Sequence, residues 1–331
     1  MGMKTEPKIA LLGSNYGQRP DPNIIALARH LTTHKDFKVV IVMARGSQNY
    51  WPADLQSTLK FVNRNSIASI SMLLKANVVF YTHSLSDIFR YAHKLPFIKQ
   101  AIDGKLVFLQ HGIIALKKTL SNGKSLGDYI GSLEPTFDLM VVSSRAEAVR
   151  VSELGIPQHK LAITGLPRFD QYQTQAQNPK NRILVFFTWQ DETQLKAKTR
   201  IVSDAIANLS DKPDIDFAHH PMMKSSAANF DISNYSLLIT DDSSLAWDFF
   251  YLGKQVIFVR PGQWLIPKND FVTQIANNPK ELESCLALAL HSPEHYKVDV
   301  RRFCDFFDQD NCARIVAAAT QSNTVETGLN T

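Results

Sequence analysis

Several histidine and hydroxyl side chains follow short apolar segments, and these residues carry the clearest chemical potential of the sequence. His111 and Gly112 come directly after the apolar run Leu106–Leu109. An imidazole there suits a general base toward a hydroxyl group, because the ordinary pKa of histidine lies near working pH. Gly112 would let the backbone approach a ligand, and Lys117 is near enough in sequence to reach a phosphate. The alternative is a loop-capping histidine with Lys117 on a solvated helix face, and position alone leaves both open.

A second histidine site follows the apolar segment Ile215–Ala218, in the sequence His219-His220-Pro221. Adjacent side chains of an extended segment point in opposite directions, so both imidazoles cannot face one site without a bend. Pro221 disfavours helix at His220 and favours an extended backbone there, which would hold one imidazole toward a ligand. A structural histidine is the alternative. No third ligand stands nearby in sequence, so no metal site is expected.

An acidic and hydroxyl-rich segment, Asp241-Asp242-Ser243-Ser244, joins an apolar strand-like run to a helical one. The start of a helix offers unpaired N–H groups and the positive end of the helix dipole, which favour a phosphate. With the two serine hydroxyls, these groups predict a phosphate site that needs no lysine. Both carboxylates would repel a phosphate, so at least one is expected to cap backbone or bind a sugar hydroxyl. The alternative is that a serine serves only as the helix N-cap.

The elements that must position these residues read as alternating strands and helices. Continuous apolar runs, as opposed to alternating ones, are typical of parallel strands buried on both faces. Ser144 and Glu147 form a capping box at the start of one helix. Thr188 follows a strand and can donate to a phosphate or cap the next helix. Strands are expected at residues 8–13, 38–43, 78–81, 106–109, 139–142, 161–164, 182–187, 215–218, 237–240 and 255–259.

The sequence also divides into regions. Residues 171–180 are polar and Gln-rich without apolar periodicity, as is typical of a linker. An N-terminal domain is therefore expected over 1–170, a C-terminal donor-binding domain over 181–321, and a loose tail over 322–331. The predicted fold class is α/β, with two doubly wound Rossmann-like domains facing a central cleft. Ligands of such folds bind at the carboxyl ends of the strands.

Composition excludes several classes of protein. At 331 residues and 44% apolar content the chain is globular, and no apolar run approaches the roughly 20 residues that span a bilayer. Its net charge of +5 suits phosphate ligands or an anionic membrane surface, but the basic residues are dispersed, which argues against nucleic acid. Three cysteines without a zinc spacing are expected to be idle thiols of a cytoplasmic protein.

The ordered set of these motifs resembles the CDP-glycerol glycerophosphotransferases, enzymes that prime or polymerise teichoic acids, together with related capsule polymerases. The resemblance spans roughly residues 105–315, and its strength lies in the order and spacing of short motifs. The first hundred residues show only a generic αβ pattern. The matching residues are His111-Gly112 with Lys117, Gly165-Leu166-Pro167-Arg168-Phe169-Asp170, Phe187-Thr188-Trp189, His220-Pro221, Ile239–Ser244 with Asp248-Phe249, and Phe306-Phe307-Asp308.

The resemblance implies a GT-B fold and transfer of a polyol phosphate from a CDP-linked donor to a hydroxyl of a surface polymer or its lipid-linked precursor. It implies that His111 is the base for the acceptor hydroxyl and that His220, Ser243 and Ser244 hold the donor's phosphates. No metal or other cofactor is required by this scheme. Further contacts with the donor's phosphates are expected from Thr188, Gly112 and Lys117. Contacts with its nucleotide or polyol are expected from Asp241, Asp248 and Arg168.

Some residues depart from the family pattern. Gln190 and His219 stand where arginines are usual, and Asp242 stands where an aromatic residue is usual. Losing two arginines and gaining an acid favours a different donor, so a GT-B glycosyltransferase that uses a nucleotide sugar is the alternative function. A non-catalytic binding subunit is a third hypothesis. Peripheral contact with the inner face of the membrane is expected because family acceptors are often lipid-linked.

The central expectation is spatial. The imidazoles of His111 and His220 should converge on a phosphate seated at the helix start near Ser243.

Overall fold

The structure is a computed structural model. It describes residues 6–92, 99–114, 125–172, 182–188, 191–209, 212–218, 231–241, 243–259, 274–292 and 300–321. No helix in these ranges is long and apolar enough to cross a membrane.

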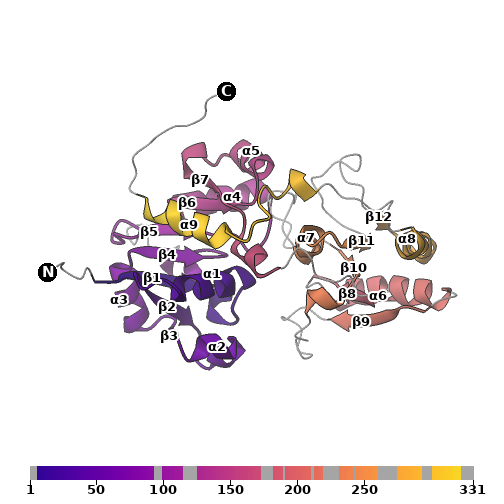
Figure 1. Ribbon diagram of the computed structural model, residues 1–331, viewed down its shortest axis with the longest axis horizontal. Coiled ribbons are helices and arrows are strands. Elements are labelled where there is room, and N and C mark those ends of the chain that lie inside the picture. Colours follow the sequence, from indigo (N-terminus) through magenta and orange to yellow (C-terminus); the bar gives the residue numbers. More distant parts are fainter. Residues whose placement is uncertain are drawn as a thin grey trace. The chain divides into compact units, whose positions relative to one another are not determined.

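The chain forms two compact units, each built on its own sheet (Figure 1). The first unit contains Met1–His111, Ile130–Gln171 and Asp305–Thr331, and the second contains Gly112–Tyr129 and Tyr172–Cys304. The strands of each sheet are parallel to their neighbours. The predicted pair of parallel-sheet α/β domains is therefore confirmed.

The first unit has a seven-stranded sheet whose order is β3-β2-β1-β4-β5-β6-β7. The chain runs outward from β1 to β3 and then returns to the other side of β1 with β4. The carboxyl ends of β1 and β4 therefore form the topological switch point, where open α/β sheets bind ligands. The strands are β1 (Lys8–Gly13), β2 (Phe37–Met43), β3 (Lys60–Asn63), β4 (Val78–Tyr81), β5 (Lys105–Phe108), β6 (Leu139–Val142) and β7 (Leu161–Ile163).

Side-chain caps define the starts of the helices in this unit. The Asp21 carboxylate accepts the Asn23 N–H at the start of α1, and the Ser144 hydroxyl accepts the Glu147 N–H at the start of α5, as predicted. The Glu147 carboxylate accepts the N–H of Ser143, one residue before the cap. The helices are α1 (Pro22–Thr32), α2 (Ala53–Gln56), α3 (Ile67–Lys75), α5 (Arg145–Glu153) and α9 (Asn311–Thr320), and the residues of α4 (Leu126–Leu133) are divided between the two units.

Helix α9 lies against the first sheet although it comes last in the chain (Figure 1). Asp170 attaches it: one carboxylate oxygen accepts the Asn311 N–H at 2.9 Å and the other accepts the Cys312 N–H at 2.7 Å. Gly165, at a φ of +77°, comes so close that a Cβ would lie 1.9 Å from the Asn311 Oδ1. The structure thus differs from the domain range 181–321, because residues 305–321 belong to the first unit.

The later Phe306-Phe307-Asp308 motif serves the same attachment. The Arg314 guanidinium donates to both carboxylate oxygens of Asp308, at 2.8 and 2.9 Å, and lies 3.8 Å from the centre of the Phe306 ring. It also donates to the Thr164 carbonyl at 3.0 Å. This motif is therefore structural within the first unit.

The second unit has a five-stranded sheet in the order β12-β11-β10-β8-β9, so its switch point lies between β8 and β10. Residues 112–129 also belong to this second unit, although the predicted range for the C-terminal domain did not include them. Its elements are β8 (Arg182–Phe186), β9 (Asp214–Ala218), β10 (Leu237–Thr240), β11 (Gln255–Val259), β12 (Gln274–Ala276), α6 (Glu192–Ala207), α7 (Leu245–Tyr251) and α8 (Pro279–His291).

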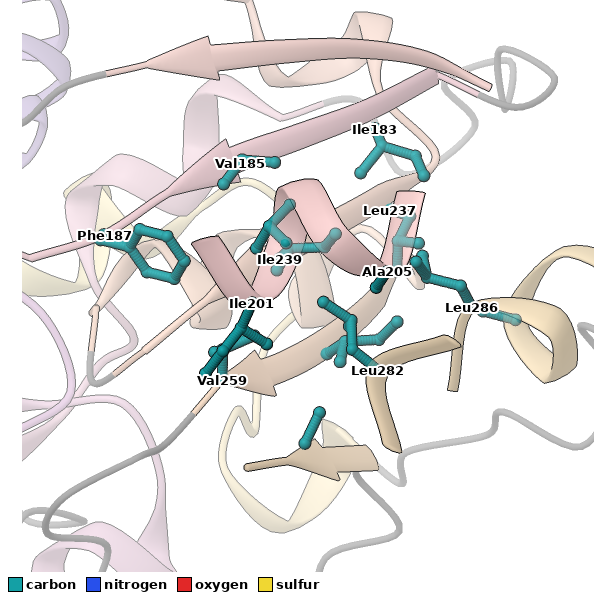
Figure 2. Packing of buried hydrophobic residues seen from close by; sticks show 14 residues of the cluster. Ile183, Val185, Phe187, Ile201, Ala205, Leu237, Ile239, Val259, Leu282 and Leu286 are labelled. Carbon is teal, nitrogen blue, oxygen red and sulfur yellow. The ribbon is translucent and has the colours of Figure 1, made fainter. Parts of the chain in front are cut away.

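Both faces of the inner strands β8, β10 and β11 are buried, which explains their continuous apolar runs. Side chains from β8, β10 and β11 pack with those of α6 and α8 on one face (Figure 2). On the other face lies α7, whose Phe250 ring is 6.3 Å from that of Phe258 on β11. The core in Figure 2 includes Ile183, Val185, Phe187, Ile201, Ala205, Leu237, Ile239, Val259, Leu282 and Leu286.

Candidate active site

His111 forms a dyad with a buried aspartate that the sequence analysis did not identify. Its Nδ1 is hydrogen-bonded to Oδ2 of Asp21, a carboxylate with no solvent exposure. The imidazole itself is 44% exposed. A carboxylate at Nδ1 holds a histidine in the tautomer whose Nε2 can accept a proton. The dyad therefore has the arrangement of a general base with its orienting acid.

Asp21 is held in its ionised form. Burial raises the pKa of Asp21, but the charge and hydrogen bond of His111, followed by the charges of Arg168 and His83, more than offset that effect. The result is a pKa below the ordinary value. A buried aspartate that remains ionised is an acceptor for the hydrogen on Nδ1 of His111 and keeps the imidazole in one orientation.

The backbone before His111 is held in an uncommon conformation. Gln110 has a φ of +63°, in the left-handed region. Its side-chain amide donates to the Val141 carbonyl at 2.6 Å, and its own carbonyl accepts from the Asn23 amide at 3.1 Å. The Arg168 guanidinium then donates to the carbonyl of His111 at 3.2 Å. These buried hydrogen bonds fix the backbone conformation at Gln110 and His111 after β5.

Arg168 was expected to contact a nucleotide or polyol. In the structure it is buried, its backbone N–H donates to the Asn23 side chain, and its guanidinium holds His111. These contacts position the dyad. Gly112 is also buried and is grouped with the second unit, while Lys117 lies outside the described residues.

A second histidine stands beside the dyad. His83 follows β4, and its ring centroid lies 4.9 Å from that of His111 with a 38° tilt. It is near Asp87, a carboxylate without solvent exposure, whose Oδ2 lies 3.8 Å from Nδ1 of His83. Like His111, His83 comes just after the end of an apolar strand. A search of every predicted strand for this pattern would therefore have identified it. Asp21 carried a weaker signal, an N-cap before Pro22.

Two histidines and two carboxylates are present here, yet they do not converge as metal ligands do. Across the described ranges, no group of three or more histidine, cysteine, aspartate or glutamate side chains could hold a metal ion.

The second unit places its polar residues at its own switch point. The N–H and the hydroxyl of Thr188, after β8, donate to the two carboxylate oxygens of Asp241, after β10, at 2.8 and 2.9 Å. Lys198 on α6 donates to the same carboxylate at 2.8 Å. Asp241 is fully buried and Lys198 is 13% exposed. Asp241 thus caps backbone, as expected of one of the acids in this segment, and its charge is balanced.

The serines after Asp241 begin helix α7. The Ser243 hydroxyl accepts the Leu245 N–H at 3.2 Å, and the Ser243 and Ser244 carbonyls accept the next two N–H groups. These first-turn N–H groups therefore have partners within the chain. In the described part of the chain the Ser244 hydroxyl makes no hydrogen bond, and its residue is half-buried.

Asp248 was expected to contact the nucleotide or polyol. It lies on α7 without solvent exposure, and its carboxylate accepts the Tyr172 hydroxyl at 3.0 Å. His220, the second expected catalytic histidine, lies outside the described residues, as do Trp189 and Asp242. The expected convergence of His111 and His220 therefore stays a prediction.

Solved structures show which fold the chain shares. The wall teichoic acid polymerase TagF aligns with a TM-score of 0.69 at 17% identity, covering 95% of this chain and 88% of that chain. The S. aureus MnaA–UDP complex has a TM-score of 0.65 at 12% identity, covering 94% and 95%. The UDP-GlcNAc 2-epimerase from Neisseria meningitidis has a TM-score of 0.64 at 13% identity, covering 94% and 98%. At these identities the likeness shows the fold, and the predicted GT-B-like class is confirmed.

Comparison of sequences adds the family. No curated protein matches the chain significantly. A family model described as CDP-glycerol:poly(glycerophosphate) glycerophosphotransferase matches residues 1–203, more than half of the chain. The chain therefore belongs to the CDP-glycerol:poly(glycerophosphate) glycerophosphotransferase family, a family of transferases.

Proposed function

We propose that this protein transfers a polyol phosphate, glycerol phosphate or ribitol phosphate, from a CDP-linked donor to a hydroxyl of a surface polymer or its lipid-linked precursor. The family match supports the reaction class. One observation carries the assignment to this chain's residues: the buried Asp21 bonded to the exposed imidazole of His111. A dyad of this kind serves a reaction that begins by taking a proton from a hydroxyl.

In the proposed reaction the acceptor hydroxyl attacks the donor phosphorus that carries the polyol. The new P–O bond forms to the acceptor oxygen while the P–O bond to the CMP phosphate breaks, and CMP leaves with that electron pair. The hydroxyl proton passes to Nε2 of His111, and the Nδ1–H bond to Asp21 stabilises the imidazolium that results. Such phosphoryl transfers depend mainly on positioning and charge stabilisation, which the buried network behind His111 supplies for the base.

The donor is proposed to bind the second unit near the starts of α6 and α7. The Thr188 and Lys198 bonds to Asp241 support this, because the Lys198 cation balances the carboxylate charge that would otherwise repel a diphosphate. The half-buried Ser244 hydroxyl is the donor of a hydrogen bond to the phosphate in this scheme. Ser243 and Asp248 hold the helix that presents it.

The test is release of CMP from CDP-glycerol and CDP-ribitol in the presence of an oligomeric or lipid-linked acceptor. Wild-type protein is expected to release CMP with at least one of these donors. His111→Ala should lower kcat by about 10²–10⁴-fold, the usual contribution of a general base, while donor affinity stays unchanged. The matched control is His159→Ala, which changes an exposed histidine of the same unit. No CMP release with either donor would refute the proposal.

A nucleotide-sugar reaction is the second candidate. The fold likeness to structures holding UDP or UDP-GlcNAc supports including it. A thermal-shift series with CDP-glycerol, CDP-ribitol, UDP-GlcNAc and GDP-sugars distinguishes the candidates, because a ligand that binds the folded state raises Tm. Stabilisation by the UDP-sugar alone, with release of UDP in the acceptor assay, would replace the polyol-phosphate assignment by this one.

The acceptor is proposed to reach the protein at the inner face of the membrane. The net charge of +5 supports peripheral attraction to anionic lipid. Sedimentation with vesicles of anionic lipid, compared with vesicles of zwitterionic lipid, tests this point, and equal recovery in both would contradict it.

A further inference from the structure

A second histidine–aspartate pair lies next to the proposed base, and the reaction as described above leaves it without a task. His83 is 24% exposed and its ring is 4.9 Å from that of His111. The two histidines follow β4 and β5, which are neighbours in the sheet. His83 itself lies at the β1–β4 switch point of the first sheet, where ligands of such folds bind.

Asp87 organises the surroundings of His83. Its Oδ2 accepts the N–H groups of Thr82 and His83 at 3.1 and 2.9 Å, and its Oδ1 accepts the N–H of Tyr16 at 2.8 Å. The Thr82 hydroxyl lies 3.0 Å from Nδ1 of His83. One buried carboxylate thus fixes the backbone on both sides of the switch point, and the Thr82 hydroxyl contacts the imidazole between them.

The same carboxylate favours the charged form of His83. Burial lowers the pKa of His83, but the nearby carboxylate of Asp87 and the charge of Asp21 more than offset it, so the pKa lies above its ordinary value. His83 is therefore suited to holding an anion, and it lies beside the half-exposed ring of His111, the proposed base.

Tyr16 and Arg64 extend this cationic surface. Three successive residues of the loop after β1 have left-handed φ angles, 47° at Asn15, 53° at Tyr16 and 79° at Gly17. Such strain is typical of functional sites. Tyr16 is 48% exposed, and its ring centroid lies 5.8 Å from that of His83 and 5.7 Å from the Arg64 guanidinium.

Arg64 adds a positive charge, and its hydrogen bonds go to a backbone carbonyl. Its guanidinium donates to the carbonyl of Ser86 at 2.9 Å through Nε and at 2.5 Å through Nη2. Asp87 and Asp21, the nearby acids, are fully buried. The exposed side chains of the cluster are therefore cationic or phenolic, while its carboxylates face inward. That arrangement suits a phosphate.

We propose that His83, with Arg64 and Tyr16, binds the phosphate of the acceptor that neighbours the attacking hydroxyl. This inference rests on the proposed function and names the acceptor as a chain ending in a polyol phosphate. In such a chain the terminal hydroxyl and the first phosphate are separated by one polyol unit, a span comparable to the distance between the two rings. With the hydroxyl at His111, the phosphate falls at His83. His83 binds substrate in this scheme and takes no proton from it.

The experiment measures kcat and KM at saturating CDP-glycerol with two acceptors, of which only the first carries a phosphate next to the hydroxyl: an oligo(glycerol phosphate) and glycerol. For His83→Gln, KM for the anionic acceptor should rise about tenfold or more, as expected for the loss of a charge-assisted hydrogen bond. KM for glycerol and the thermal stability should stay at wild-type values. Arg64→Gln should give a smaller rise for the anionic acceptor only. His159→Gln, the same exchange at an exposed position, should change neither.

Two results overturn the inference: an equal loss with both acceptors, which indicates a structural role for His83, or an unchanged KM for the anionic acceptor in His83→Gln. Failure of the proposed function itself looks different, because wild-type protein then releases no CMP with any acceptor. In that case the site is tested by NMR titration of the histidine rings with glycerol phosphate. Binding that raises the pKa of the His83 ring in wild-type protein supports the site, and unperturbed histidine signals refute it.

Discussion

Replacing Asp21 by asparagine separates the role of the dyad from the stability of the fold. In the wild-type protein Oδ1 of Asp21 accepts the Asn23 N–H at 2.8 Å, and Oδ2 is bonded to Nδ1 of His111. An asparagine has one side-chain oxygen. The backbone N–H of Asn23 can only donate, so that oxygen must stay with the helix cap. The amide nitrogen then faces His111 and donates to Nδ1.

This change reverses the tautomer of His111. With Nδ1 accepting, Nε2 carries the hydrogen and cannot take the acceptor's proton. The expected loss in kcat is that of the general base, about 10²–10⁴-fold or about 3–5 kcal/mol of barrier. Asparagine is as good an N-cap as aspartate. The free energy of unfolding should therefore change by no more than about 1 kcal/mol, and Tm by a few degrees.

The assay is CMP release at saturating CDP-glycerol, combined with thermal unfolding and with donor affinity by thermal shift. Asp54→Asn is the matched control, since Asp54 is an exposed acid of the same unit that pairs with Arg29. Wild-type kcat in Asp21→Asn, at unchanged Tm, would refute the dyad as the source of the base. A loss of kcat together with a large loss of Tm would instead assign Asp21 a structural role.

Three further predictions concern stability. Asp170→Ala removes both hydrogen bonds that cap the start of α9, so it should lower the free energy of unfolding by about 1–2 kcal/mol. The measurement is the midpoint of urea unfolding, and an unchanged midpoint would contradict the attachment of α9 by Asp170. Lys198→Met leaves the buried Asp241 carboxylate without its cation and should lower the free energy of unfolding by about 3 kcal/mol. The double variant with Asp241→Asn should regain most of that free energy. Arg314 lowers the pKa of Asp308 to about 2, so the stability this pair adds is present above about pH 4 and lost toward pH 2. Because Asp308 is half-exposed, the gap in unfolding free energy between wild type and Asp308→Asn should reach only about 1 kcal/mol at neutral pH and close near pH 2.

The fold was largely predictable because local signals agreed with it. The strands Lys8–Gly13, Val78–Tyr81 and Gln255–Val259 have the predicted bounds. Strands β3 and β12 were not predicted. Each is a short edge strand with one fully buried residue, so neither gives the apolar run by which the inner strands were found.

The candidate site was predictable only in part. His111 was found because a histidine past an apolar strand is a local pattern. Its partner Asp21 lies 90 residues away, and His83 and Asp87 reach the site through the β1–β4 switch point. Because the order of strands in the sheet brings these residues together, their spacing in the sequence does not identify them as one cluster.

By itself the sequence determined the class of fold and the types of residue at the strand ends, because hydrophobic periodicity, caps and turns act between near neighbours in the chain. Tertiary structure decided their roles. It placed the Arg168 guanidinium on the His111 carbonyl, paired Asp241 with Lys198, and brought Asp21 to the imidazole. The physical reason is that hydrogen bonds and charges depend on distance in space, and the order of strands in a sheet sets that distance.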